Sequence, residues 1–174
     1  MQGAKMRVEA TEEDDVLEAL GEHIHEVLVE DANRLVIWGS GGTLRTIAGG
    51  LGFSPTLLGI DATLGSEQIG TDLNEQNLLT LIKDHDGECT LLVSPMGGQG
   101  FLLGRGNLQL SPDVLRAVGI DAVLGVVTPA KMLTVTQLRI DTGDVELDLD
   151  FQNKKYLKVL QGYRTTRLLR VATD

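Results

Sequence analysis

The sequence is poor in cysteine, in basic residues and in long apolar runs, and each shortage excludes a class of protein. One cysteine, Cys89, among 174 residues cannot form an internal disulfide or a four-cysteine zinc site, so we expect a reducing, cytoplasmic setting. The 15 Lys and Arg against 25 Asp and Glu give a formal charge of -10, which would repel nucleic-acid phosphates. Because of this charge we expect no nucleic-acid partner. No apolar run approaches the roughly eighteen residues that cross a bilayer, so we also expect no membrane segment.

Aromatic residues and proline are also scarce, and the scarcity of proline bears on where the many glycines lie. Aromatics make up 3% of the chain, so aliphatic side chains must fill the core of a single domain. There are 21 glycines but only four prolines, a ratio that does not suit a low-complexity linker. We therefore expect the glycines at turns and at loops that face a ligand.

The apolar pattern alternates between strand-like and helix-like segments. Thr11, followed by four acidic residues, predicts a helix start, so residues 1–10 are interpreted as a linker or flexible N-terminus and residues 11–174 as one domain. Short apolar runs predict buried strands at 34–38, 56–60, 89–93 and 122–127. Helical spacing predicts helices at 44–51 and 73–83, and Ser111-Pro112 predicts the start of another.

These elements predict a three-layer α/β fold with a mainly parallel sheet and flanking helices. The tail differs, because residues 145–150 alternate strictly between apolar and acidic side chains. We interpret 145–150, 156–160 and 167–171 as antiparallel strands, the last two joined by a turn near Gly162 and Tyr163.

Ligands of parallel α/β sheets bind beyond the carboxyl ends of the strands, where this chain is rich in glycine and hydroxyl groups. The first such loop could cradle phosphate against the following helix, or could be only a tight turn. It is neither a Walker loop nor the dinucleotide fingerprint. The candidate binding residues in this loop and after two other predicted strands are Gly39, Ser40, Gly41, Gly42, Thr43, Asp61 and Thr128.

A second glycine-rich stretch follows the predicted strand 89–93. Its glycines suggest a backbone that needs positive φ or touches a ligand, its amides can bind polar groups, and its arginine can make a two-pronged contact with phosphate. The alternative is a mobile surface loop. The candidate residues here are Ser94, Gly97, Gly98, Gln99, Gly100, Gly104, Arg105, Gly106 and Asn107.

Several other polar residues have a structural alternative. Asp61, the Asp72–Glu75 segment and the Asp141–Asp144 segment could bind magnesium or ribose hydroxyls. Asp72 with Glu75 also fits a helix-capping box, and Asp141 with Asp144 fits a turn before a strand. We assign no metal site. Cys89 opens a predicted strand and is interpreted as an inert apolar residue.

Eight motifs, taken together, resemble the C-terminal half of the ATP-NAD kinase-like proteins grouped with the acetoin-catabolism protein AcoX. The most specific is Gly97-Gly-Gln-Gly-Phe101 followed by Gly104-Arg-Gly-Asn107. The others, in chain order, are Trp38-Gly-Ser-Gly-Gly-Thr43, Leu58-Gly-Ile-Asp61, Asp72-Leu-Asn-Glu75, Ser94-Pro-Met, Ser111-Pro112, Thr128-Pro129 and Leu138-Arg-Ile-Asp-Thr-Gly-Asp144.

The resemblance implies a domain of a protein that phosphorylates NAD to NADP with ATP and magnesium. Such proteins carry an upstream half with a Gly-Gly-Asp-Gly-Thr loop, which is absent from this sequence, and a glycine is expected where Arg164 stands. We therefore expect the chain to bind a nucleotide, ATP or NAD(P), or another small phosphorylated ligand, without catalysing alone. A sugar-phosphate-binding module and a structural domain that packs on a missing N-terminal domain, or on a second copy as a homodimer, are the alternatives.

Overall fold

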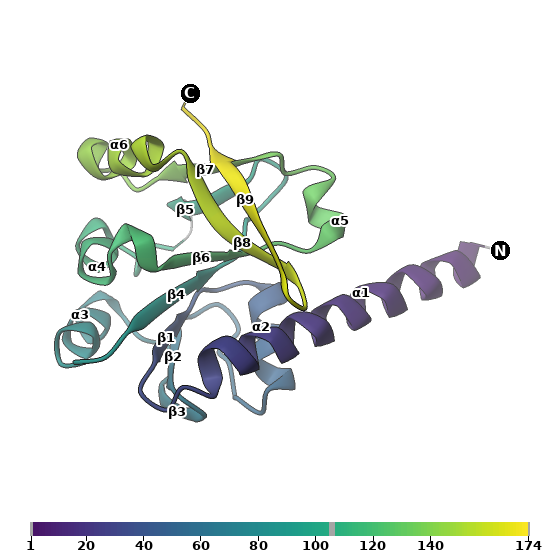
Figure 1. The fold of residues 1–174 in the computed structure, drawn as a ribbon, viewed down its shortest axis with the longest axis horizontal. Helices are drawn as coiled ribbons and strands as arrows, with labels where there is room; N and C mark the ends of the chain where they lie inside the picture. The colour runs from purple at the N-terminus through teal and green to yellow at the C-terminus, as the bar shows by residue number, and fades with distance from the viewer. Residues whose placement is uncertain (1, 105–106, 174) are drawn as a thin grey trace.

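The computed structural model describes residues 2–104 and 107–173, with side chains described from Glu12 onward. In these ranges nine strands form one sheet in the order β3-β2-β1-β4-β6-β8-β9-β7-β5, with helices on both faces (Figure 1). The strands are β1 (Leu35–Trp38), β2 (Asp61–Leu64), β3 (Glu67–Gly70), β4 (Cys89–Val93), β5 (Phe101–Gly104), β6 (Val123–Val126), β7 (Gln137–Asp141), β8 (Tyr156–Gly162) and β9 (Thr165–Val171). The helices are α1 (Gln2–Ile24), α2 (Gly42–Gly50), α3 (Glu75–Lys83), α4 (Pro112–Val118), α5 (Pro129–Met132) and α6 (Val145–Lys154), with a π-helical turn at His25–Val29 and a 3-10 turn at Ile120–Ala122.

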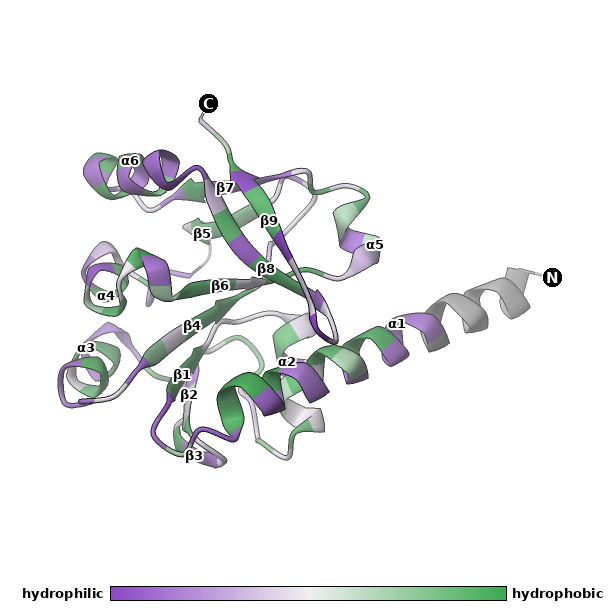
Figure 2. Cartoon of the chain, in the orientation of Figure 1, coloured by the Kyte–Doolittle hydropathy of each residue, from purple (hydrophilic) through white to green (hydrophobic). Residues whose placement is uncertain are grey.

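Two hydrophobic clusters, one on each face of the sheet, hold the three layers together. Within β1 the side chains alternate, so Ile37 joins the cluster under α3, α4 and α6, while Val36 and Trp38 join the cluster under α1 and α2. Figure 2 shows β1, β4 and β6 as mostly hydrophobic, whereas α3, α4 and α6 mix apolar and polar residues. The α/β class, the mainly parallel sheet and the C-terminal antiparallel pair β8–β9 are thus confirmed.

The second predicted strand is wrong in its position. Residues 56–60 form a loop, and β2 begins at Asp61, where the predicted strand ended. The side chains of Leu57 and Leu58 are 63% and 79% exposed, and of the apolar side chains in this run Ile60 alone enters the core. The backbone N–H of Thr56 donates to the Asp61 carboxylate instead of to a neighbouring strand.

The predicted strand at 145–150 is a helix, α6. Asp144 caps it by accepting a hydrogen bond from the N–H of Leu147. Leu147 and Phe151, four residues apart, are buried, whereas Val145 and Leu149 are 74% and 47% exposed. The apolar side chains therefore follow a helical period, and the strict alternation in the sequence is misleading.

Two helices start at residues other than those predicted. Helix α1 begins at Gln2, well before the predicted cap at Thr11, so the stretch interpreted as a linker is helical from Gln2 on. Helix α3 is capped by Asn74 in a box with Asn77, not by Asp72 with Glu75. Among the described helices, none is both long enough and apolar enough to cross a membrane.

The C-terminal half of helix α1 and the π-helical turn that follows it contact both the core and the β8–β9 hairpin. Leu20 and Ile24 are fully buried against the sheet. At the tip of the β8–β9 hairpin, the Tyr163 hydroxyl donates to Glu26 (2.9 Å) and the Arg164 N–H donates to His23 Nδ1 (3.2 Å). The N-terminal part of α1 projects from this contact, past α5 (Figure 1).

The single tryptophan joins two strands and closes the core under α2. Trp38 is 3% exposed, and its indole Nε1–H donates to Oγ1 of Thr63 on β2 at 3.0 Å. Its ring lies 6.0 Å from that of Phe53. These contacts make Trp38 a core residue whose one polar group is hydrogen-bonded.

Candidate functional site

The loops after β1, β4 and β6 leave the sheet at the same edge. These strands run parallel to one another, so their carboxyl ends lie together. Strand β2 runs antiparallel to β1, with Asp61 opposite Trp38. Asp61 therefore reaches this edge from the start of a strand, although the sequence placed it at the end of one.

One hydroxyl-bearing residue from each of these three loops lines a cavity of about 360 Å³, which we call the hydroxyl cavity. These residues are Thr43 in the first turn of α2, Ser94 after β4 and Thr128 after β6. Thr128 is 7% exposed, and its Oγ1 also accepts from the N–H of Lys131, which caps α5. The remaining lining residues are Glu13, Pro95, Ala130, Lys131 and Thr134.

The charges of the hydroxyl cavity come from Lys131 and Glu13, neither of which was a candidate from the sequence. Among the described residues, none forms an ion pair with Lys131. Its ammonium group is therefore available to an anion. Hydroxyls and an ammonium are donors that suit phosphate oxygens.

A second cavity, of about 470 Å³, adjoins the first, and Thr134 lines both. Two predicted residues, Gly98 and Gln99, lie here. Arg139 and Gln137 of β7 line the same space and were not predicted. Thr134 thus separates the cavity at the glycine-rich stretch after β4 from the hydroxyl cavity at the loop after β6.

The two glycine-rich loops are joined by a part-buried hydrogen bond. Ser40 Oγ donates to Oδ1 of Asn107 at 2.6 Å, and Asn107 is 6% exposed. Gly39, Ser40 and Gly41 line a niche of only about 10 Å³ together with Asp61, which is too small for a nucleotide. Within the first loop, Thr43 is thus the residue that faces the hydroxyl cavity.

Asp61 organises the loops around it. It is 6% exposed, and its carboxylate accepts hydrogen bonds from the N–H groups of Thr56 (2.8 Å) and Asp72 (3.0 Å) and from the Thr56 hydroxyl. These bonds hold the loop before β2 against the loop before α3. The role of Asp61 as a ligand residue stays a prediction, and it lies outside both cavities.

The glycines after β4 serve different purposes. Gly104 has φ +97°, and a Cβ there would collide with the carbonyl oxygen of Asp141, so packing against β7 requires this glycine. Gly97 also has a positive φ, +66°, but a Cβ there would meet only open space. Gly100, with φ +78°, packs closely on Gln137. Arg105 and Gly106, both predicted to bind phosphate, lie outside the described residues.

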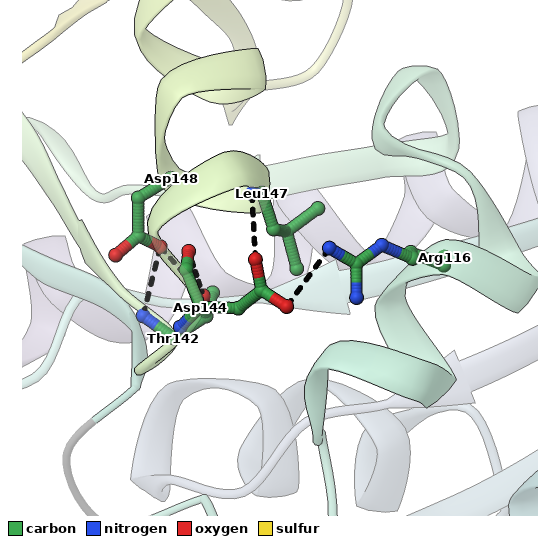
Figure 3. A network of polar contacts seen from close by, with 5 residues as sticks. All are labelled: Arg116, Thr142, Asp144, Leu147 and Asp148. Atoms are coloured by element: carbon green, nitrogen blue, oxygen red, sulfur yellow. Dashed lines mark hydrogen bonds and ion pairs between the residues drawn. The ribbon is translucent and has the colours of Figure 1, made fainter.

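The Asp141–Asp144 turn, a candidate metal site in the sequence, serves to join α4, β7 and α6 (Figure 3). The Asp144 carboxylate accepts from the Leu147 N–H at 3.1 Å and pairs with Arg116 at 2.9 Å. The Leu147 hydrogen bond, followed by the Arg116 contact, lowers the pKa of Asp144. Asp148 accepts from both the N–H and the hydroxyl of Thr142. No group of three potential metal-ligating side chains occurs among the described residues.

Cys89 has the environment of an unreactive thiol. Burial raises its pKa to about 11, against a smaller opposing effect of Arg34. A thiol needs a depressed pKa to act as a nucleophile at neutral pH. The interpretation of Cys89 as an inert apolar residue agrees with this pKa.

Lys131 could have been found in the sequence, whereas Glu13 could not. Thr128-Pro129 is a typical helix start, and the residue three positions after a capping Thr lies next to it. That position is Lys131, whose N–H donates to Thr128 Oγ1. Glu13 is one of four consecutive acids, and only the path of α1 past the loops brings it to the cavity.

Comparison with known proteins identifies a family. Residues 31–171 match the family described as the ATP-NAD kinase C-terminal domain. Neither the curated proteins nor the solved structures gave a significant match. The matched segment contains β1 to β9 and both glycine-rich loops, and it begins after α1. Because it covers most of the chain, the chain belongs to the ATP-NAD kinase C-terminal domain family.

Proposed function

We propose that this chain is the phosphate- and nucleotide-binding domain of an ATP-NAD kinase-like protein, with its binding site at the hydroxyl cavity. The intact protein would phosphorylate NAD to NADP with ATP. The observation that carries the proposal is the convergence of Thr43, Ser94 and Thr128, from three separate strand ends, with Lys131 in one cavity.

The cavity supplies donors of the kinds that bind phosphate oxygens. The three hydroxyls can donate hydrogen bonds, and Lys131 adds a positive charge. Thr43 stands in the first turn of α2, where the helix also presents unpaired N–H groups. The adjoining cavity with Gln99, Gln137 and Arg139 offers room and polar groups for the rest of a nucleotide.

We further propose that the chain binds without catalysing alone. Phosphoryl transfer requires nucleotide, metal and acceptor to be positioned together. The described residues do not hold a metal by three side-chain ligands, so magnesium would be bound jointly by cavity oxygens and by phosphates of the nucleotide. The Gly-Gly-Asp-Gly-Thr loop, placed in an upstream domain of AcoX-like proteins, would supply the remaining contacts. A cytoplasmic location is part of this proposal, since a single free cysteine suits a reducing compartment.

The test is a thermal-shift and calorimetric screen of the purified chain against NAD, NADP, ATP with magnesium, ribose 5-phosphate and coenzyme A. At a hundred times the Kd, a ligand should add about 2.7 kcal/mol, which raises Tm by a few degrees in a domain of this size. Lys131→Ala should abolish the shift. Lys83→Ala, an exposed lysine on α3 that lines neither cavity, is the matched control and should keep it.

The outcomes separate the alternatives. A shift with NAD, NADP or ATP that Lys131→Ala removes supports the proposal. A shift with ribose 5-phosphate alone would favour a sugar-phosphate-binding module. Absence of any shift, together with self-association in sedimentation, would favour a structural or oligomerisation domain.

A further inference from the structure

Glu13 places a negative charge in a cavity that otherwise suits an anion. It lines the hydroxyl cavity together with Lys131, Thr43, Ser94 and Thr128. It belongs to α1, outside the segment that matches the family, so the family assignment gives it no role. Glu13 and Lys131 share the cavity without forming an ion pair with each other in the described structure.

A carboxylate beside a phosphate site has opposite effects on the affinity for metal-free and for metal-bound polyphosphate. A metal-free polyphosphate is repelled by it, which offsets part of the attraction to Lys131. A polyphosphate that carries a divalent cation can instead place that cation between its own oxygens and the carboxylate. Magnesium is commonly held by one or two carboxylates together with phosphate oxygens and water.

The other polar side chains of the cavity are compatible with a magnesium ion bound beside the phosphates. Thr43, Ser94 and Thr128 offer hydroxyl oxygens, which are hard ligands compatible with magnesium or with its bound water. Glu13 is the one carboxylate among the lining residues, and the described chain has no group of three metal-ligating side chains. A cation at this position would therefore be held jointly by Glu13 and by the phosphates of the ligand.

We propose that Glu13 is a specificity-determining residue, which makes the hydroxyl cavity select phosphate ligands complexed with magnesium over the metal-free forms. The inference rests on the proposed function, because it concerns the same cavity. Helix α1, although it precedes the family segment, then completes the site through Glu13.

The test measures the affinity of the full chain for ATP by calorimetry, once with excess magnesium and once with EDTA. The wild type should bind magnesium-ATP about tenfold more tightly than metal-free ATP, a difference of about 1.4 kcal/mol. Glu13→Gln, which keeps the shape of the side chain, should bring the two affinities to within about twofold, by weakening the first and strengthening the second. Glu12→Gln, an exposed neighbour that does not line the cavity, should behave as the wild type.

Two results would overturn the inference without touching the proposed function. One is a Glu13→Gln variant that retains the wild-type preference for magnesium-ATP. The other is a variant that weakens both forms equally, which would mean that Glu13 contacts a hydroxyl of the ligand. A wild type that binds neither form of ATP nor any other nucleotide would overturn both proposals. An unchanged Tm for Glu13→Gln without ligand shows that the variant is folded.

Discussion

Ser40 and Asn107, 67 residues apart in the chain, are joined by a 2.6 Å hydrogen bond from the serine hydroxyl to the amide oxygen. The bond connects the loop after β1 to the segment after β5, and so holds together the two glycine-rich stretches of the sequence. Because Asn107 is 6% exposed, water does not readily replace the serine as a partner for its oxygen.

Ser40→Ala should therefore destabilise the domain by about 1–3 kcal/mol, the range for leaving a buried polar group without its partner. The measurement is the midpoint and slope of urea denaturation. Ser66→Ala, at an exposed serine between β2 and β3, is the matched control and should change stability by less than about 0.5 kcal/mol. Equal stabilities of the two variants would show that the Ser40–Asn107 bond does not tie the loops.

Asp61 offers a test that separates a structural carboxylate from a ligand-binding one. Asp61→Ala removes the acceptor for two backbone N–H groups, those of Thr56 and Asp72, and should cost about 2–4 kcal/mol. Asp61→Asn keeps one acceptor oxygen and should cost less. If Asp61 serves only the loops, Asp61→Asn should bind ligand as the wild type does, at a temperature where both are folded. A large loss of affinity with unchanged stability would instead confirm the ligand role that the sequence suggested.

Lys155 is held in a backbone conformation that favours glycine. It follows α6 with φ +72° and ψ −42°, a positive-φ conformation that glycine adopts far more easily than a residue with a Cβ. Lys155→Gly should therefore stabilise the domain by about 0.5–1 kcal/mol, seen as a higher Tm. Lys155→Ala removes the same side chain and charge but keeps the backbone penalty, so it should show no gain. A gain of equal size in both variants would point to the charge of Lys155 rather than to its backbone.

The Cys89 thiol should be almost unreactive while the protein is folded. With a pKa of about 11, its thiolate fraction at pH 8 falls on the order of a hundredfold below that of an unfolded chain. Its reaction with a disulfide reagent should be slower by at least that factor than in denaturant. The raised pKa also means that folded protein keeps the proton that unfolded protein loses, so stability should fall as the pH rises from about 9 to 11. Cys89→Ala should lack this part of the pH dependence.

The strands predicted best from the sequence are those that are buried on both faces of the sheet. Buried parallel strands are apolar on both faces, so β1, β4 and β6 stand out as continuous apolar runs. Strands β3 and β7 were missed because they lie at or next to a sheet edge and mix polar with apolar residues, and β5 was missed because its apolar run lies within the glycine-rich stretch. Helix α6 was mistaken for a strand because Val145 and Leu149, both exposed, complete an alternation that burial does not follow.

The convergence of the loops was predictable from the sequence, but the charged residues of the hydroxyl cavity were not. The rule that ligands bind at the carboxyl ends of parallel strands brought Thr43, Ser94 and Thr128 together correctly. Glu13 depends on where a helix from elsewhere in the chain passes, and no local pattern encodes that path. The departure at Arg164 has a partial explanation: its φ of +53° is a conformation that glycine adopts easily, while its guanidinium lies over the Tyr163 ring at 5.4 Å.

The indole of Trp38, which is buried and hydrogen-bonded to Thr63, is an intrinsic fluorescent probe of this part of the fold. Since the chain has one tryptophan, all tryptophan emission comes from a single known place beside Asp61 and the loop after β1. The folded state should emit at short wavelength, and rupture of the β1–β2 pair should shift the emission to the red. Movement of the loop after β1 can therefore be followed in real time without any label.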